Sequence, residues 1–250
     1  MKIRLLSAVA LLGAMASHSV LATSACPSLP DYSVLHDALV KAQQSTDKNG
    51  GFGFNMWATI VNRDGIVCAV VMTGTNRGQE WPGSRVISAQ KANTANAFSL
   101  PNFALSTANL YSAVQPGGSL FGLQESNPVD VNIAYRGSAT LYGTINDPMI
   151  GGKIGGVNVF GGGLPLYGPA GGLVGAIGVS GDSSCADHNI AWRTRQALGY
   201  DHVPAGVSAN HDDNIVYDIS NGVSASGWGH PTCSKDATAI AEGFPKAGMK

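Results

Sequence analysis

The segment from residue 161 to 198 constrains the fold most, because it joins a strand pattern to a helix pattern around one turn. Residues 173–180 alternate with a period of two, which is typical of a β-strand. The bulkier face carries Leu173, Gly175, Ile177 and Val179, and the small face carries Val174, Ala176, Gly178 and Ser180. A face of small side chains lets a helix or a second subunit approach the backbone closely.

A helix is expected directly after this strand. Gly181 turns the chain, and Ser183 or Ser184 can cap the helix, with Asp187 favourably placed in its first turn. The apolar stripe of this helix consists of Ala186, Ile190, Ala197 and Leu198. The segment therefore predicts a strand, a turn and a helix that pack together as one corner of an α/β core.

Other segments also have regular patterns. Apolar residues at helical spacing predict helices over residues 32–44 and 85–98, and strand patterns predict a hairpin of residues 56–61 and 66–72. The remaining expected elements are short helices at 103–111 and 237–242 and short strands at 129–134, 139–145 and 215–219.

A secretory signal peptide is predicted over residues 1–22, where two basic residues precede an apolar run and a small-residue cleavage site. The apolar run, residues 5–16, is too short to span a bilayer, and no later stretch is long and apolar enough. We therefore expect a periplasmic or secreted protein without a membrane span. Lipidation of Cys26 is an alternative, since residues 23–26 resemble a lipoprotein cleavage box except for the threonine at its first position.

One domain with additions is expected from length and composition. About 228 of the 250 residues remain after cleavage, which is enough for one sizeable core. The net charge is −1 with 12% charged residues and no basic cluster, which argues against a nucleic-acid partner. The 33 glycines, dense between residues 117 and 181, indicate many tight turns. We expect a core domain over residues 23–200, with an elaborated insertion at 115–159 and a C-terminal extension at 201–250.

Four cysteines allow three pairings: Cys26, Cys68, Cys185 and Cys233. A bond between Cys185 and Cys233 would attach the C-terminal extension to the core helix, and it would leave Cys26 for Cys68. A zinc site is the alternative, because Cys185, His188, His230 and Cys233 form a set that tetrahedral zinc accepts. An oxidising compartment favours the disulfide.

Four segments, in order, resemble the GlcG/HbpS family of haem-binding proteins. They are WATIVNRDGIVCAVVMTG, GSRVISAQKANTANAF, GGGLPL, and GAIGVSG followed by DHNIA. The resemblance implies an α/β (α+β) fold of the profilin-like kind, with a central antiparallel sheet flanked by helices. It also implies a homo-oligomer and non-covalent binding of haem or a related tetrapyrrole in some members. The chain departs from the family in its long region 115–159 and in the tail after Tyr200.

The family motifs suggest a ligand site between the 85–98 helix and the glycine turn. Lys91 would meet a carboxylate or propionate, with Thr94 on the same helical face. The turn formed by Gly162, Gly163 and Pro165 would let a planar ligand approach the backbone, and Asp187 completes the set.

His36 is the candidate iron ligand, because it lies on the edge of the first helix and offers an imidazole. A surface histidine is the alternative interpretation. Covalent attachment of haem is excluded, since the sequence has no Cys-x-x-Cys-His motif.

Two other functions remain open at this point. One is a small-molecule enzyme in which Lys91, Thr94 and Asp187 surround an organic acid and perform acid–base chemistry. The other is an oligomeric interaction module whose interface is the small-residue face of the strand at 173–180.

Overall fold

A four-stranded antiparallel sheet forms the centre of the computed structural model, which describes residues 25–248. The strands are β1 (Trp57–Asn62), β2 (Val67–Met72), β3 (Gly163–Tyr167) and β4 (Leu173–Ser180), in the order β2-β1-β4-β3. In the register of β1 with β4, Thr59 lies opposite Gly178. The predicted α+β architecture is confirmed. The predicted signal peptide lies outside the described residues.

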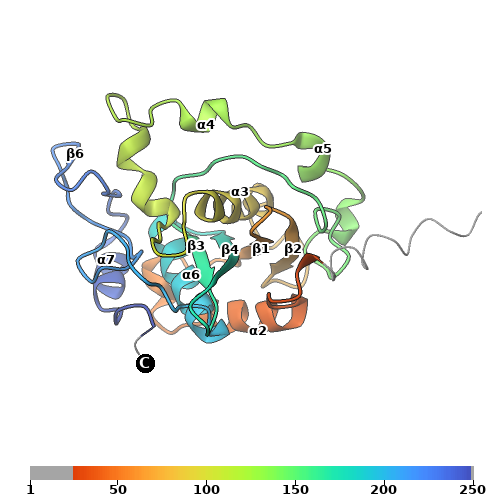
Figure 1. Cartoon of the computed structure of the whole chain (residues 1–250). Coiled ribbons are helices and arrows are strands. Elements are labelled where there is room, and N and C mark those ends of the chain that lie inside the picture. Colours follow the sequence, from red (N-terminus) through yellow and green to blue (C-terminus); the bar gives the residue numbers. More distant parts are fainter. Residues whose placement is uncertain (1–24, 249–250) are drawn as a thin grey trace, which may run out of the picture.

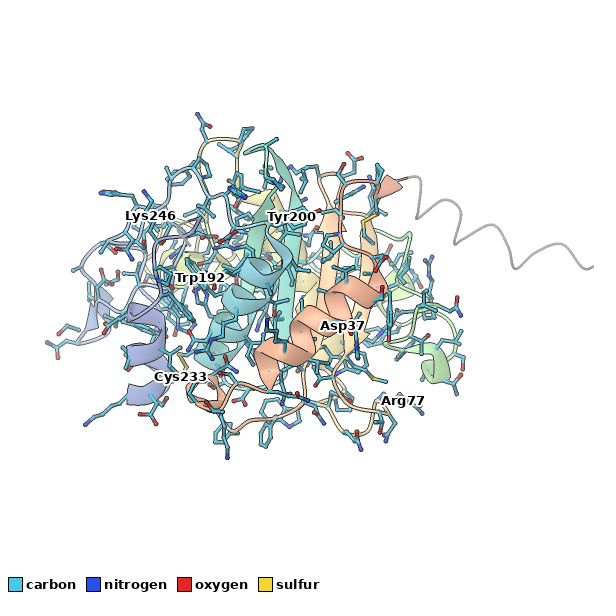
Figure 2. The ribbon with its side chains drawn as sticks, turned by 90° about the horizontal axis from the view of Figure 1, so that it is seen from below. Asp37, Arg77, Trp192, Tyr200, Cys233 and Lys246 are labelled. Carbon is cyan, nitrogen blue, oxygen red and sulfur yellow. A yellow bond between two sulfur atoms is a disulfide. The ribbon has the colours of Figure 1, made fainter. Side chains whose placement is uncertain are left out.

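Helices cover both faces of the sheet (Figure 1). Helix α3 (Ser84–Ala97) packs on one face, against β1, β4 and β3. Helices α2 (Tyr32–Gln43) and α6 (Ser184–Leu198) lie side by side on the other face, as the view in Figure 2 shows. The alternation predicted for β4 agrees with these layers, since Ile177 and Val179 join the core under α2 and α6, and Ala176 joins the core under α3.

Close packing of α3 on β4 explains the small face of that strand. A Cβ on Gly178 would overlap Ser88 O and would lie 2.5 Å from Ala92 N, both backbone atoms of α3. The expected close approach is therefore confirmed, and its partner is a helix of the same chain. The interpretation of this face as a subunit interface is wrong, because α3 occupies it.

The predicted cap of α6 is also confirmed, since the Ser183 side chain accepts a hydrogen bond from Ala186 N. The N-cap position of α3 is Gly83, which provides no side-chain cap. The short elements are η1 (Lys48–Gly50), η2 (Thr107–Leu110), η3 (Ser112–Val114), α4 (Leu123–Ser126), α5 (Val131–Ala134), η4 (Ala139–Leu141), β5 (Ile219–Ser220), β6 (Val223–Ser224) and α7 (Lys235–Glu242).

The predictions of strands at 129–134 and 139–145 are wrong, because these segments contain the helical turns α5 and η4. Local caps explain the difference. Asp130 accepts a hydrogen bond from Asn132 N, and Ser138 accepts one from Thr140 N, so each side chain starts a helical turn in a short segment. The strand expected at 215–219 is also wrong for most of its length, since regular pairing begins only at β5.

Both predicted disulfides are present. Cys26 is bonded to Cys68, which attaches the N-terminal segment to β2, and Cys185 is bonded to Cys233, which attaches the extension to α6. The Cys185 and Cys233 sulfurs are therefore not the thiolates that a zinc site requires. The sulfur of Cys26 is likewise bonded to protein, which leaves no thiol for a lipid.

The insertion covers the outer side of α3 (Figure 1). The insertion is anchored by the buried Asp147 carboxylate, which accepts hydrogen bonds from Arg85 Nε at 2.8 Å and from Arg85 Nη2 at 2.5 Å. Ala134, Met149 and Ile154 add apolar contacts to the core on this side. The insertion thus forms an additional layer over α3.

The extension is held to α6 in a similar way. Arg195 donates to both carboxylate oxygens of Asp213, at 2.6 and 2.8 Å, and both side chains are buried. The ring of Phe244 stacks on Trp192, with centroids 5.5 Å apart. No helix among the described residues is long and apolar enough to cross a membrane.

Candidate functional site

Lys91 and Asp187 form a buried ion pair. Lys91 Nζ lies 2.7 Å from Asp187 Oδ2 and donates a second hydrogen bond to Val179 O at 3.1 Å. The side chains are 2% and 3% exposed. Lys91 belongs to α3 and Asp187 to the first turn of α6, so the pair links helices from the two faces of the sheet beside the end of β4.

The Asp187 carboxylate is fixed by a further hydrogen bond, since its Oδ1 accepts Asp182 N–H at 2.9 Å. Burial raises the pKa of Asp187 to about 6, although the Lys91 ammonium acts to lower it. Burial is therefore the largest influence on the pKa of this carboxyl group.

The glycine turn closes against this pair. Gly162 has φ +116, a conformation that side chains rarely adopt, and a Cβ there would lie 3.1 Å from Lys91 Nζ and 3.0 Å from the Asp187 Cβ. At Gly163 a Cβ would lie 2.6 Å from Lys91 O and would overlap the methyl group of Thr107. The lack of a side chain at Gly162 and Gly163 thus leaves room for the side chains of Lys91, Asp187 and Thr107.

Two buried histidines lie near the ion pair. Burial lowers the pKa of His188 to about 3 and that of His230 to about 4, and the Lys91 charge acts in the same direction. His188 Nε2 lies 3.2 Å from Asn214 Oδ1, and the ring of His230 lies 5.3 Å from that of Tyr111. The extension therefore contributes His230 to the surroundings of the pair.

The other predicted residues of this set have separate contacts. Thr94 Oγ1 donates to Gln90 O at 2.8 Å and accepts Asn158 N–H at 3.0 Å, so it holds the end of the insertion. Pro165 lies within β3, and its carbonyl accepts from Arg195 at 3.1 Å. The structure thus brings together Lys91, Asp187, Gly162 and Gly163.

Surface hollows occur elsewhere. One, of about 470 Å³, lies beside α7 and is lined by residues from Thr232 to Glu242. Another, of about 310 Å³, is lined by residues of α2 and α6, including Lys41 and Arg193. Neither includes Lys91 or Asp187.

His36 lies on α2, and therefore on the opposite face of the sheet from α3. Its side chain is 36% exposed, and its Nδ1 lies 3.3 Å from Asp37 Oδ1. Its ring is stacked with Tyr32 at 6.0 Å and 11°. His36 thus lies partly exposed on one side of the sheet, whereas Lys91 is buried on the other side.

Sequence reasoning missed three aromatic side chains at the surface: Phe52, Phe54 and Trp81. It also missed Asp182, whose carboxylate accepts the backbone N–H groups of Phe52, Gly53 and Phe54. The phenylalanines at alternate positions in GFGFN were the available signal, but no periodic element contains them.

No curated protein matches this chain. A solved structure called "Crystal Structure of PduOC:Heme Complex" is 24% identical with a TM-score of 0.45, and the match covers 66% of this chain and 89% of that chain. Klebsiella pneumoniae protein ORFY is 23% identical with a TM-score of 0.43, covering 66% and 87%.

A third solved structure is a double mutant of Streptomyces reticuli HbpS. It is 18% identical with a TM-score of 0.39, and the match covers 80% of this chain and 99% of that chain. The model of one protein family, described as "Haem degrading protein HbpS-like", matches residues 32–195, a range that contains α2, α3, all four strands of the central sheet and most of α6. The chain therefore belongs to the HbpS-like family of haem-degrading proteins.

Proposed function

We propose that the protein binds haem without a covalent bond, in a compartment outside the cytoplasm. The observation that carries this proposal is the family match, which spans nearly the whole core from α2 to α6. Two disulfides support an oxidising compartment, in agreement with the expected signal peptide.

His36 is the proposed iron ligand. Its Nδ1 faces the Asp37 carboxylate, an arrangement that favours a proton on Nδ1 and leaves the Nε2 lone pair for a metal. Tyr32 stacks on the imidazole and orients it. Haem would supply an iron centre there, and the protein's part is to present one imidazole at a partly exposed surface.

Lys91 and Asp187 belong to the interior in this proposal. A haem propionate could reach Lys91 only by replacing Asp187, because both side chains are almost completely buried. The same burial argues against an organic-acid enzyme at this pair, since neither the ammonium nor the carboxylate is free to contact a substrate. We therefore assign the first contact with haem to the surface that carries His36.

A haem titration followed by absorption tests this function. The protein is expected to give a saturable shift of the Soret band, and His36→Ala is expected to change the position of that band. His202→Ala is the control, because His202 is exposed and lies in the extension, and it should leave the spectrum unchanged. A titration of the wild-type protein without a saturable shift would show that the haem proposal is wrong.

Two further properties belong to the proposal. The mature protein is expected to begin at Thr23, which mass spectrometry of protein from a cell envelope or culture medium would check. The family resemblance supports a homo-oligomer, and sedimentation analysis would find a monomer if that is wrong.

A further inference from the structure

Three large aromatic side chains lie together at the surface. Phe52, Phe54 and Trp81 are 65%, 43% and 51% exposed. The Phe52 and Phe54 rings are stacked with centroids 5.2 Å apart, and the Trp81 ring meets Phe54 edge-on at 5.3 Å. We call these three side chains the aromatic platform. Clustered exposed aromatic groups are unusual on a soluble surface and mark binding sites.

The backbone of Phe52 and Phe54 is held in place by hydrogen bonds to the side chains of Asp182 and Gln43. The buried Asp182 carboxylate accepts N–H groups of Phe52, Gly53 and Phe54 at 2.9 to 3.2 Å. Gln43, at the end of α2, donates its Nε2 to Phe54 O at 3.1 Å. A rigid platform binds with a smaller loss of conformational entropy than a mobile one.

The hydrogen bond between Gln43 and Phe54 connects the platform to the helix that carries His36. Gln43 follows His36 by seven residues, so both side chains lie on one face of α2, about 10 Å apart along the helix. Gln43 touches the backbone of Phe54, so the face of α2 that carries His36 leads toward the platform. From an iron held at His36, a porphyrin with its propionate arms extends over most of the distance between His36 and Gln43.

The charges around the platform suit an anionic ligand. Lys48 is exposed, and its Cδ lies 3.2 Å from the position that a Cβ would take on Gly53. Arg77 is also exposed and extends from the lower edge of the molecule in Figure 2. The neighbouring carboxylates of Asp182 and Glu80 are buried and accept backbone N–H groups. The exposed Asp47 carboxylate beside Lys48 is paired with Arg193 at 2.7 Å.

We propose that the aromatic platform is part of the haem site, where the edge of a porphyrin held at His36 packs on the rings and its propionates meet Lys48 and Arg77. This inference rests on the proposed function and extends it from one iron ligand to a binding surface. Aromatic contacts supply affinity and the cations orient the propionates.

The test compares haem affinities of Phe52→Ala and Trp81→Ala with that of the wild-type protein. Each variant is expected to weaken binding by about 2- to 10-fold, the range for one aromatic contact, without changing the Soret position. Lys48→Gln combined with Arg77→Gln is expected to weaken binding further and to reduce its dependence on salt. Phe121→Ala is the matched control, because Phe121 is 66% exposed on the insertion, and it should bind haem as the wild-type does.

The outcomes separate this inference from the proposed function. If the wild-type and His36→Ala proteins behave as expected but both platform variants bind haem with unchanged affinity, the platform inference is wrong and haem binding stands. If these variants dissociate an oligomer in sedimentation while haem affinity stays the same, the platform is a surface for a second copy, which also overturns the inference. A wild-type protein that does not bind haem overturns both.

Discussion

At the scale of single residues, the Lys91–Asp187 pair is the clearest feature, because both charges are removed from water and satisfy one another. Removal of one partner from a buried pair is strongly destabilising, whereas replacement of both is often nearly neutral. This asymmetry distinguishes an internal ion pair from a ligand site.

Lys91→Met is expected to lower the free energy of unfolding by about 3 to 5 kcal/mol at pH 8, because it leaves the Asp187 carboxylate buried without a cation. The loss should be smaller at pH 5, because the raised pKa of Asp187 rises further without Lys91 and the folded protein then keeps that group protonated. Urea unfolding at both pH values measures this difference.

The double variant Lys91→Met, Asp187→Asn is the control for that measurement. It has no buried charge at this position, so it should recover much of the stability and lose the dependence on pH. Equal losses for the single variant at pH 5 and pH 8 would contradict the buried pair.

The buried histidines predict sensitivity to acid. The pKa of His188 is lowered to about 3 and that of His230 to about 4, from an ordinary 6.5, so the unfolded chain binds protons that the folded protein does not. Their contribution to stability is complete above pH 6.5 and is lost as the pH falls toward 4, by up to about 1.4 kcal/mol per pH unit for each histidine. Asp187 opposes this trend between pH 6 and 4, because its pKa is raised.

His230→Gln isolates one histidine from these opposing contributions. Relative to the wild-type protein, its free energy of unfolding should fall less steeply between pH 6.5 and 4.5. His202→Gln, at an exposed position, should retain the wild-type profile in urea unfolding. A variant at His230 with the wild-type slope would count against burial of this imidazole in the neutral form.

At the scale of elements, the contact between α3 and β4 depends on the missing side chain of Gly178. Gly178→Val would force the new side chain into the backbone of α3 at Ser88 and Ala92, and it is expected to cost at least about 1 to 3 kcal/mol. Thermal unfolding should show a clearly lower Tm. Gly172→Val is the matched control in the turn before β4, since a Cβ there meets nothing within 4 Å.

At the scale of the whole molecule, residues 115–159 and 201–250 are attached to the helices around the central sheet by buried links. Arg85 and Asp147 hold the insertion, and Arg195 with Asp213 and the disulfide of Cys233 hold the extension. The two segments thus contribute Asn158, which contacts Thr94, and His230, which lies near Lys91.

Loss of the disulfide between Cys185 and Cys233 tests the attachment of the extension. The double substitution to serine is expected to lower stability by about 2 to 4 kcal/mol, because the bond closes a loop with a sequence separation of 48. Limited proteolysis should then cleave within residues 201–250 before it cleaves the core. Protection equal to that of the wild-type protein would mean that the noncovalent contacts suffice.

The sequence by itself determined the local elements and the family. Periodic patterns specified α2, α3, the β1–β2 hairpin, β4 and α6, because alternation and helical spacing depend only on which face meets the core. The small face of β4 also specified close packing, the compartment argument favoured disulfides over zinc, and the position of Cys233 in the extension indicated its pairing with Cys185.

Only the tertiary structure decided how distant segments meet. It placed Lys91 against Asp187, His36 on the other face of the sheet, and Trp81 against Phe54, because these positions depend on how segments far apart in the chain pack together. The insertion differs, because local caps at Asp130 and Ser138 outweigh its strand-like composition. Burial, which determines whether a charged motif faces a ligand or its own protein, is a property of the packed molecule.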